Sequence, residues 1–220
     1  MAKEPERERT LLYLITPPRI TDIAAFVHQF EAAIEGGDMA SLQVRLKSGT
    51  EIDAHTTREV AQAIQPLCRA NNIALIINDS PQLCRALEAD GVHLGMDDMD
   101  IKAARELVGP DVIIGATCKS SRHTAMMAGE AGADYVAFGA FHPTETKAGT
   151  SPAEPEILTW CQMFLTLPCV AIGGITTSNA APLIQAGADF LAVSNGVWAH
   201  PDGPAAAVAT FNRLIDEAFA

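Results

Sequence analysis

The chain has 220 residues, of which 48% are hydrophobic and 19% are charged, and its formal net charge is -12. A chain of this length can bury one full core without a second domain, and its composition is that of a soluble globular protein rather than a disordered one. The acidic balance argues against binding of nucleic acid or of an anionic membrane, so a site for an anionic ligand must be local.

The N-terminal stretch MAKEPERERT is charged and has no apolar segment. We therefore expect one domain over residues 1–220, with residues 1–10 as a disordered tail and no export signal. No run approaches 18 apolar residues, which excludes a membrane-spanning helix. The five cysteines form no C-x-x-C pair and lie mostly in apolar stretches, a pattern typical of reduced core thiols in a cytoplasmic protein.

Eight short runs have the composition of buried β-strands. They are LLYLIT (11–16), SLQVRLK (41–47), IALIIND (73–79), GVHLG (91–95), VIIGAT (112–117), YVAFGAF (135–141), CVAIGGI (169–175) and FLAVSNG (190–196). Near-continuous apolar strands of this kind are typical of a parallel sheet that is covered on both faces.

Stretches with helical periodicity separate these runs. The pattern predicts helices over 22–34, 59–70, 81–89, 101–108, 122–131, 178–186 and 205–218. Three similar turns, at 88–93, 131–135 and 186–190, lead from helix to strand, and their glycines fit helix C-caps.

Alternation of eight strands with helices leaves two architectures, a doubly wound sheet and a barrel. No G-x-G-x-x-G follows the first strand and no G-x-x-x-x-G-K-[ST] occurs, so dinucleotide and Walker-type sites lose their main support. Eight compact units favour an α/β fold of the (β/α)₈ TIM barrel type, slightly below its usual length of about 250 residues.

Polar residues lie at the carboxyl ends of the predicted strands. In a TIM barrel, the carboxyl ends of the strands form the active site. In the second run, alternation places Gln43, Arg45 and Lys47 on one face and Leu46 on the other, towards the helices. Further along the chain these strand-end residues are Asn78, Asp79, Asp97, Asp98, Thr117, Lys147, Gly173, Gly174, Ser194 and Asn195.

Two chemistries suit this set. Carboxylates such as Asp79 and Asp98 suit a hard cation such as Mg²⁺, while Arg45, Lys47 and Lys147 suit phosphate oxygens. The glycine pair 173–174, followed by hydroxyl residues and a helix, permits close approach of an anion.

Structural roles stay open for the same residues. Asp79 precedes Ser80 and Pro81 and could be a helix N-cap, and the carboxylates at 97, 98 and 100 could favour the dipole of the next helix. Arg45 and Lys47 could be a solvated strand end. His93 is interpreted as a hydrogen-bonded core residue, because the histidines have no metal-ligand spacing. No nucleophile signature occurs.

The strand-end motifs resemble the thiamine phosphate synthase family over nearly the whole chain. The matching segments are Gln43–Lys47 for Gln-x-Arg-Glu-Lys, Ile77-Asn78-Asp79, Gly91–Gly95 with Asp98, Pro143-Thr144-Glu145-Thr146-Lys147 and Ala171–Ile175. PTETK in this context is highly specific.

The resemblance implies a transferase that condenses 4-amino-2-methyl-5-hydroxymethylpyrimidine diphosphate with 4-methyl-5-(2-hydroxyethyl)thiazole phosphate, or its carboxylated form. The products are thiamine phosphate and diphosphate, and Mg²⁺ assists the loss of diphosphate. No nucleic acid or membrane is involved, and the oligomeric state stays open, including a homo-oligomer.

The resemblance also implies roles for individual residues. Asp79 and Asp98 hold Mg²⁺, and Lys147, Arg45 and Lys47 act on the departing diphosphate. The pyrimidine substrate is held by Gln43 and Asn78, with Thr117 contributing a hydroxyl, and the thiazole phosphate by Thr144, Thr146, Gly174, Ser194 and Asn195.

The chain departs from the family pattern at Leu46 for Glu, at Met96 and Asp97 for Gln-Glu, and at Thr117 and Lys119 for the Ser and His of Gly-x-Ser-x-His. These departures leave two alternatives. One is a thiazole tautomerase-like isomerase, which uses a histidine base where this chain has Lys119. The other is a catalytically silent phosphate-binding paralogue.

Overall fold

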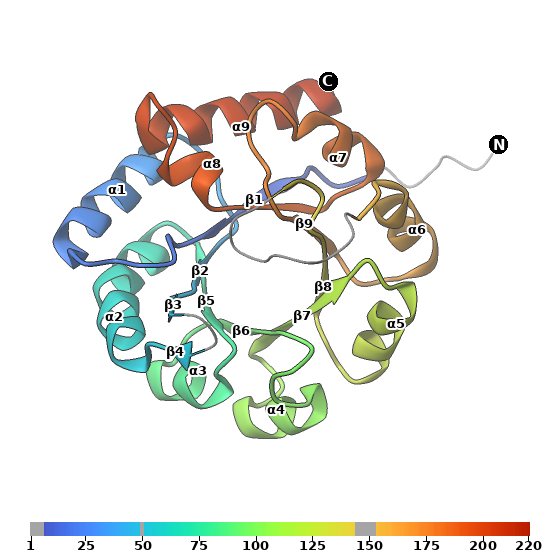
Figure 1. The fold of residues 1–220 in the computed structure, drawn as a ribbon, viewed down its shortest axis with the longest axis horizontal. Coiled ribbons are helices and arrows are strands. Elements are labelled where there is room, and N and C mark those ends of the chain that lie inside the picture. Colours follow the sequence, from blue (N-terminus) through green and yellow to red (C-terminus); the bar gives the residue numbers. More distant parts are fainter. Residues whose placement is uncertain (1–6, 49–50, 144–152) are drawn as a thin grey trace.

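Eight parallel strands close into a barrel in the computed structural model, which describes residues 7–48, 51–143 and 153–220 (Figure 1). Around the barrel the order is β1, β10, β9, β8, β7, β6, β5 and β2, and helices form an outer ring. The predicted (β/α)₈ TIM barrel is therefore confirmed.

The barrel strands are β1 (Leu11–Ile15), β2 (Ser41–Val44), β5 (Ala74–Asn78), β6 (Gly91–Leu94), β7 (Ile113–Lys119), β8 (Tyr135–Phe138), β9 (Cys169–Ile172) and β10 (Phe190–Val193). The helices are α1 (Ile23–Glu35), α2 (Ala54–Ala70), α3 (Pro81–Leu87), α4 (Ile101–Val108), α5 (Arg122–Glu130), α6 (Glu156–Phe164), α7 (Ala181–Ala186), α8 (Asn195–Trp198) and α9 (Gly203–Phe219).

The second strand is shorter than predicted. It ends at Val44, and the chain then forms a separate antiparallel hairpin of β3 (Lys47–Ser48) and β4 (Glu51–Ile52). Leu46 is 4% exposed and packs in the large apolar cluster that joins strands to helices, as the alternation predicts. Lys47 therefore lies on the hairpin beyond the carboxyl end of the barrel strand.

Three helices differ most from the sequence prediction. One, α8, begins at Asn195 inside the run 190–196 that was predicted as a strand. The helix expected from residue 59 begins at Ala54, because the Asp53 side chain accepts a hydrogen bond from the Thr56 N–H and caps it. The segment before β9 had no predicted helix but contains α6, in which Met163 and Phe164 are exposed. Because apolar side chains lie on both faces of α6, the segment has little helical periodicity.

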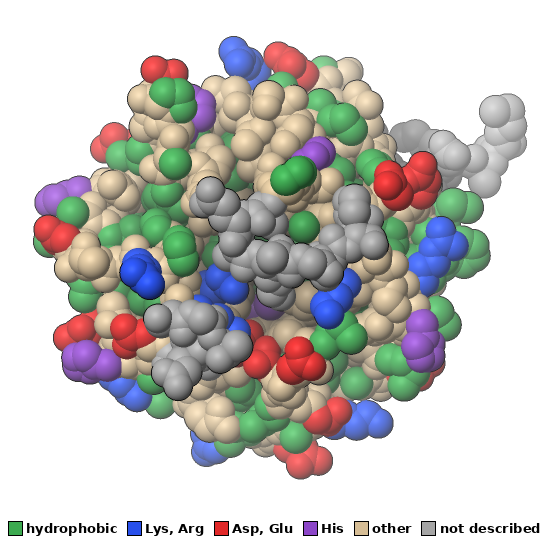
Figure 2. Space-filling model, in the orientation of Figure 1, with side chains coloured by type: hydrophobic (Ala, Val, Ile, Leu, Met, Phe, Trp, Pro, Cys, Tyr) green, Lys and Arg blue, Asp and Glu red, His purple; other side chains and the backbone are tan. Residues whose placement is uncertain are grey.

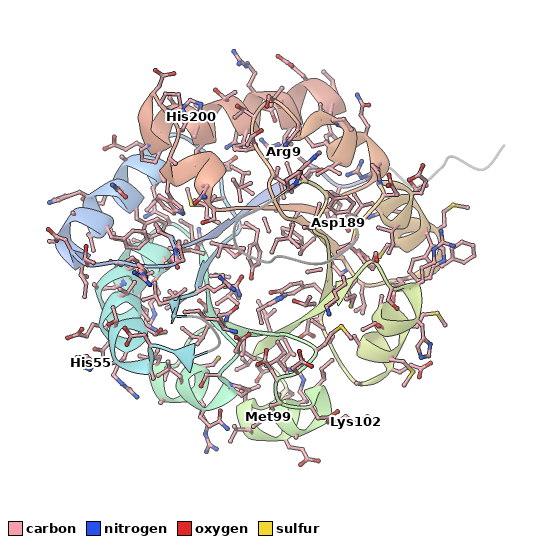
Figure 3. The ribbon with its side chains drawn as sticks, viewed as in Figure 1. Arg9, His55, Met99, Lys102, Asp189 and His200 are labelled. Atoms are coloured by element: carbon pink, nitrogen blue, oxygen red, sulfur yellow. The ribbon has the colours of Figure 1, made fainter. Side chains whose placement is uncertain are left out.

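The three predicted helix-to-strand turns share one hydrogen bond. The Oδ2 atoms of Asp90, Asp134 and Asp189 each accept a backbone N–H from the first or second residue of a neighbouring strand, at 2.7 Å in all three. The donors are Leu75, Ile114 and Cys169 (Asp189 is labelled in Figure 3). Gly132 and Gly187 have left-handed backbones at the helix ends, as predicted, but in the first turn Glu88 takes that conformation. These aspartates are structural.

The expectation of a disordered tail is wrong for residues 7–10. Arg7 donates to the carbonyl oxygens of Ile184 and Ala188, and Thr10 is fully buried. Arg9, labelled in Figure 3, donates to Asp216 of α9 at 2.8 Å. Residues 1–6 lie outside the described part of the chain. The charged side chains of Arg7 and Arg9 therefore bind this segment to α7 and α9.

All five cysteines are free and buried. Burial raises the pKa of Cys68, Cys84 and Cys118 to about 12, so these thiols stay protonated at neutral pH. This agrees with the interpretation of reduced core thiols. Within the described residues, no helix is long and apolar enough to cross a membrane.

Gly115 of β7 provides space inside the barrel. A Cβ atom at this position would overlap the ring of Tyr135 on the adjacent strand β8. We expect Gly115→Ala to lower the free energy of unfolding by about 3 kcal/mol, because rigid strands cannot move apart to accept the methyl group. Urea unfolding measures this free energy.

Gly132→Ala is the control, because a Cβ at this position would meet nothing within 4 Å. It should lower the free energy of unfolding by about 1 kcal/mol, through backbone strain alone. Equal losses in both variants would contradict the packing argument.

Candidate active site

Charged residues gather at the barrel mouth. The space-filling view down the barrel shows Lys or Arg and Asp or Glu side chains meeting near the centre of this face (Figure 2). Asp79 follows the carboxyl end of β5, Asp98 follows β6, and Lys47 lies on the hairpin after β2. Since β2, β5 and β6 are neighbours in the barrel, these three side chains come together.

Asp79 is the centre of this group. Its side chain is 6% exposed and its Oδ2 pairs with the Lys47 ammonium, which is 22% exposed. Its backbone has a left-handed φ of 61°, and its N–H donates to the His93 carbonyl oxygen at 2.8 Å. Burial lowers the pKa of the Arg45 guanidinium, and the Asp79 carboxylate opposes that change. Asp79 thus interacts with two cations, Lys47 and Arg45.

Asp98 brings a second carboxylate to the same place. Its Oδ2 accepts the Gly95 N–H at 2.7 Å. Burial raises the pKa of the Asp98 carboxyl, and the adjacent Asp79 carboxyl raises it further, whereas the Gly95 N–H and the Lys47 ammonium oppose the rise. The two carboxyl groups are close enough to interact directly, although they come from different strands.

Neither carboxylate caps a helix. Ser80 is the N-cap of α3, because its side chain accepts the Leu83 N–H, and Asp100 is the N-cap of α4, where it accepts from Lys102 and Ala103. The N-cap alternative is therefore wrong for Asp79, and Asp98 does not cap α4. Helix stability does not explain why two like charges are held together here.

The donor set fits Mg²⁺. Mg²⁺ binds hard oxygen ligands and usually takes one or two carboxylates, with water and phosphate oxygens completing its shell. Asp79 and Asp98 supply two carboxylates, and among the described residues no group of three or more His, Cys, Asp or Glu side chains could hold a metal. This arrangement suits a cation that arrives with a phosphate ligand better than a fully protein-bound ion.

The amide side chains Gln43 and Asn78 lie inside the barrel below the charged group. Gln43 is 2% exposed and donates from Nε2 to Asn78 Oδ1 at 2.7 Å. On the next two strands of the barrel, β6 and β7, His93 Nε2 lies 2.8 Å from the Thr117 hydroxyl, and His93 Nδ1 lies 2.9 Å from the Tyr135 hydroxyl of β8. The interpretation of His93 as a hydrogen-bonded core residue is confirmed.

The remaining predicted residues lie across the mouth. Gly174 and Ser194 follow the adjacent strands β9 and β10, and Asn195 begins α8. A Cβ at Gly174 would meet the Pro143 carbonyl oxygen, so glycine here allows the turn to pack on the segment after β8. The Ser194 hydroxyl donates to the Thr16 carbonyl oxygen at 3.1 Å and links the end of β10 to the end of β1.

Three of the predicted site residues, Thr144, Thr146 and Lys147, lie outside the described residues.

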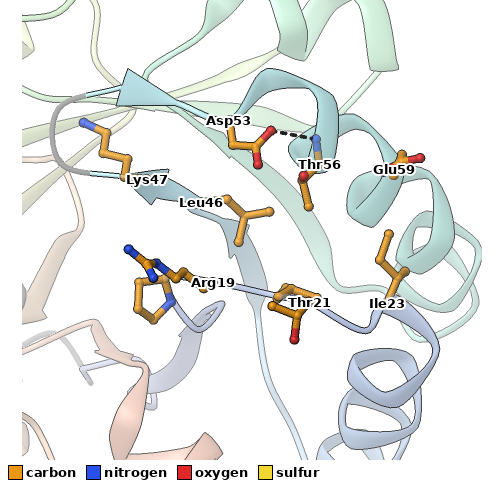
Figure 4. Close-up of a pocket in the computed structure, with 10 residues that line it drawn as sticks. Arg19, Thr21, Ile23, Leu46, Lys47, Asp53, Thr56 and Glu59 are labelled. Atoms are coloured by element: carbon orange, nitrogen blue, oxygen red, sulfur yellow. Dashed lines mark hydrogen bonds between the residues drawn. The ribbon is translucent and has the colours of Figure 1, made fainter.

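Two cavities have residues of the charged group in their walls. One, of about 430 Å³, has both Asp98 and Thr117 in its wall. The other, of about 470 Å³, lies between the segment after β1 and the start of α2, and Lys47 and Arg19 line it. Figure 4 shows the Lys47 and Arg19 side chains extending to the same side of this cavity.

Sequence reasoning missed three residues here. Arg19 follows the first strand, so the strand-end rule applied to residues 17–19 would have found it. Tyr13 and Tyr135 lie within apolar runs and resemble ordinary core residues, but their hydroxyls contact each other at 2.9 Å inside the barrel. Their signal is a hydroxyl at an inward-facing position of a buried strand.

Comparison with known proteins agrees with this geometry. A family model described as thiamine monophosphate synthase matches residues 12–197. A thiamine-phosphate synthase from Hyphomonas neptunium is 61% identical over 211 residues, covering 96% of each chain. One from Rhodospirillum centenum is 53% identical, covering 93% of this chain and 97% of its own. Among solved structures, thiamine phosphate pyrophosphorylase from Pyrococcus furiosus superposes with a TM-score of 0.81 at 30% identity, covering 96% of this chain and 97% of its own.

Proposed function

The chain belongs to the thiamine monophosphate synthase family and is a transferase that forms thiamine phosphate, and we propose that the two substrates meet at its barrel mouth. One substrate is the hydroxymethylpyrimidine diphosphate and the other is the thiazole phosphate or its carboxylated form. The observation that supports this best is the pair of adjacent carboxylates, Asp79 and Asp98, flanked by Lys47 and Arg45.

The diphosphate side of the site belongs to β2, β5 and β6. Asp79 and Asp98 would hold Mg²⁺, which supplies positive charge to the diphosphate oxygens when bound. Lys47 and Arg45 bind further oxygens of the same group, and Lys147 acts with them from the segment after β8. Together these cations stabilise the negative charge that grows on the diphosphate as its bond to the methylene carbon breaks.

The chemistry needs positioning rather than a protein nucleophile. The electron pair of the C–O bond leaves with the diphosphate, and the pyrimidine-methyl cation is stabilised by the amino group of its own ring. The thiazole nitrogen then donates its lone pair to form the C–N bond. Gln43, Asn78 and Thr117 orient the pyrimidine, and Gly174, Ser194, Asn195, Thr144 and Thr146 hold the thiazole phosphate.

The tautomerase alternative has less support. It calls for a histidine base after β7, and this chain has Lys119 there, at the end of the strand. We place the enzyme in the cytoplasm with small-molecule substrates, in keeping with its five free cysteines.

Incubation of the purified protein with both substrates and Mg²⁺ tests the proposal. We expect thiamine phosphate and diphosphate to form in equal amounts, and the reaction to stop when a chelator removes the metal. Binding of both substrates without turnover would indicate the silent paralogue. Conversion of the thiazole phosphate in the absence of the pyrimidine would indicate the isomerase.

A further inference from the structure

We propose that α5 and α6 carry the surface through which two copies of this chain form a symmetric dimer. We call this surface the α5–α6 face and define it by Arg122, Met126, Met127 and Glu130 of α5 and by Met163 and Phe164 of α6. Both helices belong to the outer ring around the barrel (Figure 1). The proposal does not depend on the reaction or on the metal.

Large apolar side chains that are exposed to water are concentrated on these two helices. Of the six among the described residues, four lie here: Met126 is 46% exposed, Met127 50%, Met163 71% and Phe164 67%. Figure 2 shows hydrophobic side chains beside a Lys or Arg side chain at the edge of the molecule over these helices. Single apolar residues are normal on a surface, but a group on two neighbouring helices indicates contact with another molecule.

Side-chain contacts hold the α5–α6 face in one shape. The Arg122 guanidinium lies over the Trp160 ring, 5.4 Å from its centroid, and the Trp160 and Phe164 rings stack with their centroids 6.1 Å apart. A Cβ at Gly129 would meet the Leu167 side chain at 3.0 Å, so glycine lets α5 pack closely on the segment after α6. Because these rings are already ordered, they lose little conformational freedom when a partner covers them.

The apolar area of this face matches the apolar part of a stable interface. Side chains of the size of methionine and phenylalanine have about 200 Å² of surface each, so the four exposed ones leave about 450 Å² in contact with water. A stable interface buries about 800 Å² on each partner, of which about 55–65% is apolar. The four side chains therefore supply the apolar part of one such interface, and the charged residues around them supply polar area.

The charges on α5 make this face complementary to itself. Arg122, Met126 and Glu130 are exposed and follow one another at intervals of four residues, so they form one ridge along the helix. The opposite side of the helix carries the buried Ala125 and Ala128. When two such ridges run in opposite directions, Arg122 of each copy meets Glu130 of the other, and the two Met126 side chains meet at the two-fold axis.

Helix geometry allows this contact. Ridges formed by residues four apart pack together when the helices cross at about 50°, the commonest arrangement between helices. Positions eight residues apart are separated by about 12 Å along one helix, so Arg122, which lies over Trp160, does not pair with Glu130 of its own copy. Because the two α5 helices run in roughly opposite directions, the two barrel mouths open on opposite sides and both admit substrates.

The mixed charge of the ridge favours a second copy over another partner. A uniformly acidic partner would place a like charge against Glu130, and a uniformly basic one would do so against Arg122. The net charge of -12 makes distant parts of two copies repel each other. At physiological salt this repulsion is screened beyond about 8 Å, whereas the charges in contact at the interface keep their attraction.

Sedimentation of the purified full chain over a range of concentrations tests the proposal. We expect particles of twice 23.3 kDa, with a dissociation constant on the order of 1 μM, at the weak end for interfaces of this size. A wild type that stays monomeric at about a hundredfold higher concentration would overturn the proposal.

Charge reversal tests the contact between the copies. We expect Arg122→Glu and Glu130→Arg each to raise the dissociation constant by about a hundredfold, because like charges then meet at two symmetric positions. The double variant carrying both substitutions restores opposite charges and should dimerise within about threefold of the wild type. Glu217→Arg is the matched control. It changes the net charge as Glu130→Arg does, but it lies on α9, away from α5 in the outer ring, and should leave the constant unchanged (Figure 1).

The melting temperature of each variant verifies folding, which should persist because the substituted side chains lie on the surface. Unchanged dimerisation in both single variants, no recovery in the double variant, or an equal weakening in Glu217→Arg would each overturn the proposal. Dimerisation that begins only after removal of residues 1–6 would show that the face is covered within one copy, and this result would also overturn it.

Discussion

Asp79→Asn and Asp98→Asn are each expected to lower turnover by about a hundredfold and to raise the Mg²⁺ concentration needed for half-maximal rate. Each substitution removes a hard anionic ligand and keeps the size of the side chain. Asn tolerates the left-handed backbone that Asp79 adopts, so the turn after β5 should persist. Initial rates over a range of Mg²⁺ concentrations measure both effects.

Stability should change little in these two variants. Asp79→Asn loses the ion pair with Lys47, but it also relieves the repulsion between two adjacent carboxylates. Asp100→Ala is the control, because Asp100 caps α4. It should lower the free energy of unfolding by about 1 kcal/mol and leave the Mg²⁺ dependence unchanged. Near-normal turnover with unchanged Mg²⁺ dependence in both Asn variants would contradict the metal assignment.

Lys47→Met is expected to lower kcat/KM for the pyrimidine diphosphate by about a hundredfold, because it removes the cation that we propose to face the leaving group. The carboxylates of Asp79 and Asp98 then face each other without their ammonium partner. We expect a loss of about 2 kcal/mol in the free energy of unfolding, less than for a fully buried pair because Lys47 is 22% exposed.

Added Mg²⁺ should distinguish this explanation from a general loss of stability. If Lys47 balances the charge of the carboxylate pair, Mg²⁺ should raise the Tm of Lys47→Met more than that of the wild type. Lys102→Met is the matched control, since Lys102 lies on the outer helix α4 (Figure 3) and forms no ion pair among the described residues. Equal Mg²⁺ stabilisation of wild type and Lys47→Met would count against this role.

The barrel was predictable because buried parallel strands leave a continuous apolar signal, and turns such as 131–135 and 186–190 repeat their Gly and Asp residues. The end of β2 was harder to predict. Polar and apolar residues continue to alternate through Arg45, Leu46 and Lys47, although the barrel strand ends at Val44. The alternation continues because Leu46, which follows the strand, still packs in the apolar cluster between strands and helices.

The sequence predicted that Lys47, Asp79 and Asp98 meet at the barrel mouth, but not which neighbouring residues cap the helices. Asp79 and Ser80 are both good N-cap residues, and only the left-handed backbone of Asp79 makes Ser80 the cap. The sequence cannot show this choice, since it depends on where β5 ends relative to β6. The contact between the Tyr13 and Tyr135 hydroxyls inside the barrel was not predicted, because tyrosine suits both an apolar core and a polar contact.

Calorimetric titration of inorganic diphosphate into the protein, with and without Mg²⁺, tests the central claim most directly, because it needs no turnover. The claim is that Asp79 and Asp98 bind the metal that accompanies the diphosphate. We predict tight binding by the wild type that depends on Mg²⁺, and loss of that dependence in Asp79→Asn and Asp98→Asn. Diphosphate binding by the wild type with the same affinity in the presence and absence of Mg²⁺ would contradict it.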